Sequence, residues 1–288
     1  MNLWDRKCKG GNVAIKFDIQ KALDTLDWGF ILRVLTAFGF GEIFVLWIKE
    51  LLGFSYLVLR VFDKVTLFPL FFFCLAQEVF SRGISSLIEF GAMRRVNAPR
   101  GVMPHSDVLF ANDIMVFIQG TTKNLRVLMR FMVEYGLNSG QFINKSKSLA
   151  FLGHYTRPRQ ASILCTLGIG VGSFPFTYLG VPIFQGRPKK QFFQAIADRV
   201  CCKLSAWKGS LLSHAGQLQL ISSVIQSLLI YSFQVYEWPS SLLTKVQSWI
   251  RNFFWSGDPN SRGAPLVAWK SCCLPKDHGG LGIKDLLS

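Results

Sequence analysis

Acidic side chains are scarce in this sequence. Its 288 residues include 17 Asp and Glu against 32 Lys and Arg, which gives a formal net charge of +15. Such an excess of positive charge favours phosphate-rich partners, although a solvated basic surface would give the same count. Hydrophobic residues make up 50% of the chain, so it can bury the cores of one large domain or two small ones.

The cysteines do not form a disulfide framework or a zinc motif. Their number is odd, seven, and their spacing is not that of a disulfide scaffold. Two pairs are adjacent in sequence, Cys201-Cys202 and Cys272-Cys273, and adjacent cysteines cannot both easily ligate one ion, even with His278 nearby. We therefore expect reduced thiols in an intracellular protein.

The sequence also gives no clear signal peptide or membrane span. Residues 1–7 have no apolar core of the kind that a signal peptide needs. The apolar run 65–76 contains Pro69 and is much shorter than the roughly 20 residues of a span. Residues 209–236 carry no charged side chain, but Ser, Gln and His interrupt them and the large apolar residues have helical spacing. We expect no contact with a membrane.

Apolar periodicity predicts the order of helices and strands. The expected strands cover residues 13–19, 108–117 (a hairpin) and 148–152. The expected helices cover residues 21–38, 44–52, 75–89 and 124–135, the last closed by Gly136. A Gly- and Pro-rich passage over 167–188 separates these from three further amphipathic helices. The pattern favours an α+β fold with a small antiparallel sheet, followed by a helical lobe.

Two acids end or adjoin the predicted strands. Asp18 ends the first strand, and Asp113 lies in the hairpin within the string Phe110-Ala111-Asn112-Asp113. Carboxylates presented from adjacent strands are what a two-metal phosphoryl-transfer site needs. Asn112, next to Asp113, has an amide side chain at a position where such a metal site would need a further carboxylate.

A series of motifs resembles the reverse transcriptases of plant LINE-type (non-LTR) retrotransposons. The match runs in the right order over nearly the whole chain, and its motifs are residues 17–28, 108–114, 139–144 with Lys147-Ser148, 178–182, 206–209, 211–213 and 279–283. The resemblance implies a polymerase palm-like antiparallel sheet with helices over 1–153, a connecting segment over 154–188 and a helical thumb-like lobe over 189–288. It implies RNA-directed DNA synthesis with two Mg²⁺ ions on an RNA template and a DNA primer, and a nuclear location.

The resemblance also assigns roles to single residues. Asp18, the carbonyl of Ile19 and Asp113 match metal ligands, and Asn112 takes the place of the first acid of an Asp-Asp pair. Lys147 matches a lysine near the leaving pyrophosphate, a proton donor. Simpler interpretations stay open, because Asp18 could be a solvated acid at a strand end and Lys147 a surface lysine.

Further departures from the family pattern accompany Asn112, and lost catalysis is predicted from Asn112, the altered template-contact loop and the fingers segment. Leu23 stands where the family has an aromatic ring beneath the sugar, although it could equally pack in a helix core. The interval 53–70 keeps only Pro69-Leu70 of a Gly-rich template-contact loop and its following motif. Because only 17 residues precede Asp18, we expect the fingers segment of the family to be absent. We interpret the sequence as a degenerate copy that does not polymerise. We expect Asp24 and Asp27 to cap the start of the following helix and not to bind metal.

Basic residues gather in the region that resembles a thumb. They could track the backbone of a duplex without reading its sequence, or form a solvated helix face; the candidates are Lys189, Lys190, Arg199, Lys203 and Lys208, with Trp207 beside them. The alternative function is therefore a nucleic-acid-binding module without catalysis, which would lose affinity steeply with salt.

Overall fold

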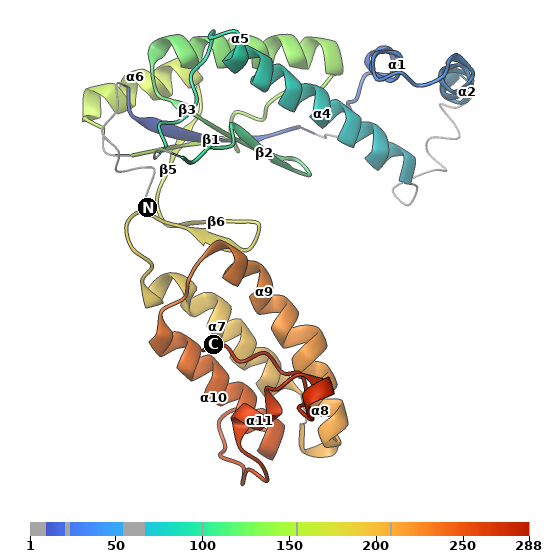
Figure 1. The fold of residues 1–288 in the computed structure, drawn as a ribbon. Coiled ribbons are helices and arrows are strands. Elements are labelled where there is room, and N and C mark those ends of the chain that lie inside the picture. Colours follow the sequence, from blue (N-terminus) through green and yellow to red (C-terminus); the bar gives the residue numbers. More distant parts are fainter. Residues whose placement is uncertain are drawn as a thin grey trace. The chain divides into compact units, whose positions relative to one another are not determined.

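The computed structural model describes residues 10–20, 24–53, 67–98, 101–153, 155–207 and 209–287. The chain separates into two compact units, residues 1–173 and 174–288. The first is an α+β unit and the second is largely helical (Figure 1). The division between the units falls inside the expected connecting segment, residues 154–188.

The first unit is built on a five-stranded mixed sheet of order β2-β3-β1-β4-β5. The pairs β2·β3, β3·β1 and β1·β4 are antiparallel, whereas β4·β5 is parallel. The strands are β1 (Asn12–Asp18), β2 (Asp107–Phe110), β3 (Asp113–Gln119), β4 (Leu149–Leu152) and β5 (Gly170–Gly172). The antiparallel sheet expected from the sequence is present, and β5 adds a parallel edge.

Helices cover one face of this sheet (Figure 1). The covering helices are α4 (Leu67–Glu89), α5 (Thr122–Ser139) and α6 (Arg157–Leu167). Two further helices extend this layer: α1 (Trp28–Ala37) packs against α4 and α5, and α2 (Glu42–Gly53) packs against α1. Alternate residues of β1, among them Ile15 and Phe17, are fully buried against the helices because side chains of a strand alternate between its two faces. Ile114 and Val116 of β3 join them in the same core.

Several helix boundaries predicted from the sequence are wrong. The helix expected over 21–38 begins only at Trp28, because the Asp27 carboxylate accepts from the Phe30 N–H at 2.6 Å and caps its first turn. Asp27 thus caps a helix as expected, whereas Asp24 lies in a turn. The helix expected over 75–89 extends back to Leu67.

The glycine that ends α5 is Gly140 rather than Gly136. Gly140 has the left-handed φ of 76° that closes helices, and its N–H donates to the Gly136 carbonyl. Gly136 is instead a close-approach position, because a Cβ there would lie 3.0 Å from the Phe142 ring. Apolar periodicity alone does not separate these two roles.

Residues 157–172 also differ from the expected connection. They form α6 and β5, and β5 pairs with β4 in the first unit's sheet. Ile163 and Leu167 of α6 are buried in the core of that unit. A segment that contributes to both core and sheet is part of the unit and not a linker.

The second unit has a small hairpin and a helical core. Its elements are β6 (Phe176–Tyr178), β7 (Val181–Ile183), α7 (Lys190–Ala206), α8 (His214–Leu220), a π-helical turn (Ile221–Ile225), α9 (Gln226–Val235), α10 (Ser240–Ser256) and α11 (Trp269–Cys272). Fully buried Phe193, Ile221, Val246 and Phe253 show that α7, α10 and the long helix 214–235 share one core. The three amphipathic helices expected from the sequence are all present.

Two helices are long and apolar enough to cross a membrane, residues 70–89 and 214–235. Core helices of soluble proteins meet the same criterion. Phe80 and Ile84 of the first helix, and Ile221 and Leu229 of the second, are buried in the cores described above. The expectation that the chain does not contact a membrane stays a prediction.

Candidate functional site

The structure places Asp18 and Asp113 opposite each other on neighbouring strands. The pairing of β1 with β3 runs from Asn12 opposite Gln119 to Asp18 opposite Asp113, so both acids lie at the same end of the sheet. Asn112 lies in the turn that joins β2 to β3, and its carbonyl accepts from the Ile19 N–H at 3.1 Å. The backbone thus holds the end of β1 against this turn.

Both acids lie on the sheet face opposite the helix-covered core. Asp18 is one residue from buried Phe17, so its side chain lies on the other face, which it shares with Lys16. Residues paired across antiparallel strands also share a face, which adds Asp113. Lys16 Nζ lies 2.8 Å from Asp113 Oδ2, and these two side chains are 25% and 31% exposed.

The loop before β4 fixes the end of β1. The Asp18 N–H donates to Ser148 Oγ at 3.2 Å, and the Asn144 N–H donates to the Asp18 carbonyl at 2.7 Å. Ser148 is fully buried, and its hydroxyl also donates to the Asn144 carbonyl. Lys147 lies in this loop and is exposed. The region that resembles a palm motif is therefore hydrogen-bonded directly to the strand that carries Asp18.

The turn carrying Asn112 has an unusual backbone. Ala111 has a φ of 48°, the left-handed region that an alanine rarely adopts. Gln77 of α4 donates from Nε2 to the Ala111 carbonyl. Ala111 and Asn112 are both exposed, so the amide side chain projects from a tight, anchored turn.

The donor set is too small for two divalent ions. A pair of Mg²⁺ ions is held by several shared carboxylates. Within the described residues, no three His, Cys, Asp or Glu side chains gather as metal ligands. Asp18 and Asp113 supply two carboxylates, Lys16 already binds one of them, and Asn112 brings no charge. The described residues do not fit the two-ion site that the resemblance implies.

Two predicted site residues lie outside the described residues, namely Leu23 and Lys208. The same holds for residues 54–66 of the interval that departs from the family's template-contact loop. The remaining residues predicted in the first unit, Asp18, Ile19, Asn112, Asp113 and Lys147, all lie around the end of β1 as described above. Ile19 is 3% exposed.

The basic residues of α7 do not share one face. Lys189, Lys190, Arg199 and Lys203 are all exposed. Arg199 and Lys203 are four residues apart and lie one above the other on the helix surface. Lys190 precedes Arg199 by nine residues, which at 3.6 residues per turn places it on the opposite side. Arg199 and Lys203 can therefore approach one backbone together.

Trp207 has a structural role that its position beside the lysines does not reveal. It is half-buried, and its ring centroid lies 5.9 Å from that of buried Phe253. It packs against the core of the second unit. This placement leaves less of the ring free for base stacking than the sequence alone would indicate.

Sequence reasoning missed Lys16 and Ser148 as residues of the site. The signal for Lys16 was available, because it precedes Asp18 by two residues in a strand and so shares its face. Ser148 was named only as part of a motif, and nothing in the sequence indicates that its hydroxyl accepts from the Asp18 backbone.

No family model matches this sequence. An Arabidopsis thaliana protein named "Putative ribonuclease H protein At1g65750" is 34% identical to it over 104 residues, which is 36% of this chain and 17% of that protein. Another A. thaliana protein, "Uncharacterized mitochondrial protein AtMg00310", is 36% identical over 58 residues, 20% of this chain and 38% of that protein. The matched regions therefore span only 17% and 38% of these relatives.

Proposed function

We propose that this chain is a retroelement-derived protein of reverse transcriptase ancestry that has lost polymerase activity. The observation that carries the proposal is the placement of Asp18 opposite Asp113 at the end of two antiparallel strands, with the amide of Asn112 in the adjoining turn. The partial similarity to a protein named as a ribonuclease H is compatible with such an origin. A nuclear location and the use of Mg²⁺ in the ancestral reaction belong to the same proposal.

The loss of activity follows from charge. Nucleotidyl transfer needs two cations that hold the triphosphate and the primer 3′-hydroxyl, and each cation needs anionic oxygens. Asn112 offers only a neutral oxygen, and Lys16 Nζ lies 2.8 Å from Asp113 Oδ2, where it competes with a cation for this carboxylate. Of the two acids, Asp18 is the one whose carboxylate forms no ion pair in the described part of the structure. One such carboxylate is insufficient for the reaction.

A primer-extension assay tests this proposal. The full chain is incubated with an RNA template, an annealed DNA primer, dNTPs and either Mg²⁺ or Mn²⁺, and we expect no extension. Processive extension that Asp18→Ala abolishes would overturn the proposed loss of activity. The same RNA–DNA hybrid, followed without dNTPs, tests for the cleavage that the name of the first relative describes. We expect none, because no cluster of three acids forms in the described part of the chain.

A second candidate function is nucleic-acid binding without catalysis. The exposed pair Arg199 and Lys203 on α7 favours it, since both can approach successive phosphates of one duplex. The expected ligand is then an RNA–DNA duplex, which corresponds to the RNA template and DNA primer of the ancestral reaction. Fluorescence anisotropy at increasing salt tests this function, because phosphate contacts weaken steeply as salt rises. Absence of binding at low salt would contradict it.

A further inference from the structure

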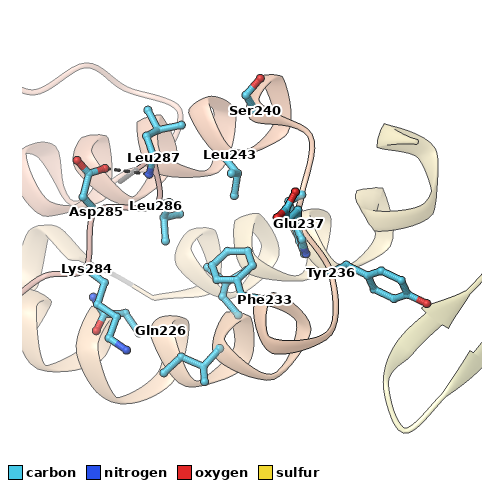
Figure 2. A pocket seen from close by; sticks show the side chains of 13 residues that line it. Gln226, Phe233, Tyr236, Glu237, Ser240, Leu243, Lys284, Asp285, Leu286 and Leu287 are labelled. Carbon is cyan, nitrogen blue, oxygen red and sulfur yellow. Dashed lines mark hydrogen bonds between the residues drawn. The ribbon is translucent and has the colours of Figure 1, made fainter. Parts of the chain in front are cut away.

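The second unit contains a cavity of about 370 Å³ that lies between α9, α10 and the C-terminal segment (Figure 2). Its walls are mostly apolar and include Leu229, Phe233, Leu243 and Leu286. A cavity of this volume lies within the range of small-molecule sites, roughly 300–1,000 Å³. All of its lining residues belong to the second unit, so it is separate from the acids of the first unit.

One buried polar side chain in the wall has an unsatisfied hydrogen-bonding group. Gln226 is 9% exposed, and its Nε2 is buried with no hydrogen-bond partner. Leaving a buried donor unpaired costs about 1–3 kcal/mol. Because the last torsion of a glutamine side chain has a broad range, a small rotation can turn Nε2 toward an acceptor in the cavity.

The backbone before Gln226 explains why this side chain faces inward. Residues 221–225 form a π-helical turn, and the Gln226 N–H donates to the Ile221 carbonyl five residues earlier. Such a turn inserts a residue and rotates the next part of the helix about its axis. Ile225 and Gln226, which lie at the end of this turn, are both buried. π-Helical turns often occur at functional sites.

The charges at the cavity do not favour an anionic ligand. Lys284 lies near Gln226, on the side away from Glu237, with Phe233 and Leu286 between the two sides (Figure 2). Asp285 also lines the cavity, and its carboxylate accepts from the Leu287 N–H at 3.1 Å. One lysine against two acids gives no net positive charge that would hold an anion.

We propose that this cavity binds an uncharged, largely apolar small molecule whose carbonyl oxygen accepts a hydrogen bond from Gln226 Nε2. The apolar walls supply the affinity, because burial of apolar surface is the main favourable term. Gln226 supplies selectivity, because a ligand without an acceptor leaves its Nε2 unpaired. The cost of the unpaired donor in the free protein is then offset in the complex.

A pair of matched dyes tests this proposal on the full chain. The first is the fluorescent aromatic ketone 6-propionyl-2-dimethylaminonaphthalene, and the second is 2-dimethylaminonaphthalene, which lacks the carbonyl. We expect the wild-type chain to bind the ketone more tightly than the second dye. After the contribution of the extra carbons is subtracted, the remaining difference should be about threefold to tenfold, the effect of one hydrogen bond. Gln226→Met keeps the size of the side chain and should remove that preference while binding of the second dye is unchanged.

Two more variants locate the binding. Leu243→Trp fills the cavity and should weaken both dyes at least tenfold, whereas Leu266→Trp, at a residue that is 81% exposed, should change neither. Gln226→Met should also raise the melting temperature of the ligand-free protein, because it removes an unpaired buried donor. An equal ketone preference in wild type and Gln226→Met, or unchanged binding in Leu243→Trp, would overturn the proposal. Absence of dye binding to the wild type would overturn it as well.

Discussion

Asp18 and Asp113 face each other across the β1·β3 pair, and Lys16 binds the Asp113 carboxylate at 2.8 Å. Like charges directly opposite each other destabilise a sheet, and a lysine two residues along the same strand offsets that repulsion. The cluster is therefore stabilised by a side chain of the protein itself. A third acid in the adjoining turn would change this balance and create a demand for a metal cation.

Asn112→Asp should create measurable affinity for divalent cations. The substitution adds a carboxylate to the exposed turn beside Asp113, and hard cations prefer such ligands. We expect saturable Mn²⁺ binding by isothermal titration calorimetry in the variant and none in the wild type. Gln219→Glu adds the same charge at an exposed site in the second unit and should bind no ion.

The same variant should still fail to extend a primer. Leu23 and the interval 53–70 also depart from the family pattern, and Asn112→Asp repairs neither. The prediction would be contradicted if Asn112→Asp extended a primer and the double variant Asp18→Ala/Asn112→Asp did not. That result would show that the single amide caused the loss of activity.

Loss of the lysine should cost little stability. Lys16→Met breaks an ion pair whose two side chains remain partly exposed, and such pairs contribute about 0–1 kcal/mol. Phe17→Ala, at the next residue, removes a fully buried ring and should cost about 3–5 kcal/mol. Urea denaturation followed by circular dichroism compares the two variants. Equal destabilisation would mean that the ion pair holds the strand ends together.

The sequence predicted the strands better than the ends of the helices. Periodicity and strand-end acids were sufficient to place Asp18 near the hairpin of Asp113, because a buried strand leaves few alternatives for register. The start of α1 depends on the Asp27 cap, and the end of α5 depends on which glycine adopts a positive φ. Such local hydrogen bonds and backbone angles leave little trace in apolar periodicity.

The sequence indicated that Asp18 and Asp113 lie close together, but not which residues surround them. The hydrogen bonds from Ser148 and Gln77 join segments that are far apart in the sequence, so no local pattern indicates them. The sequence also could not predict the cavity at Gln226. A π-helical turn breaks the 3.6-residue period on which the helix prediction depends.

Gly140→Ala should destabilise the first unit more than Gly39→Ala. Both glycines have a positive φ, 76° and 82°, a conformation that costs an alanine about 1–2 kcal/mol. A Cβ at Gly140 would in addition collide with the carbonyl oxygen of Thr25, whereas Gly39 has open space around it. Thermal melts of the two variants measure the difference. Equal melting temperatures would show that residues 24–27 can move away without loss.

The Cys273 thiol should react slowly in the folded protein. Burial, the Asp285 carboxylate and the neighbouring Cys272 raise the pKa of Cys273 from 9.0 to about 11. Two pKa units mean roughly 100-fold less thiolate at pH 8, and the thiolate is the form that reacts. Iodoacetamide labelling read by mass spectrometry should accelerate by about that factor in urea. Because the folded pKa is the higher one, stability from this group is present below pH 9 and falls as the pH rises toward 11.

Neutralising Arg199 and Lys203 together should weaken binding of an RNA–DNA duplex. The two side chains lie on one face of α7 and can contact one duplex backbone, so their loss should lower the slope of log affinity against log salt by about 2. Lys190 lies on the opposite side of the helix. Lys190→Ala should therefore change the slope by less than half as much as the double substitution does. Fluorescence anisotropy from about 50 to 200 mM salt measures both slopes. A larger effect of Lys190→Ala would place the duplex on the other side of α7.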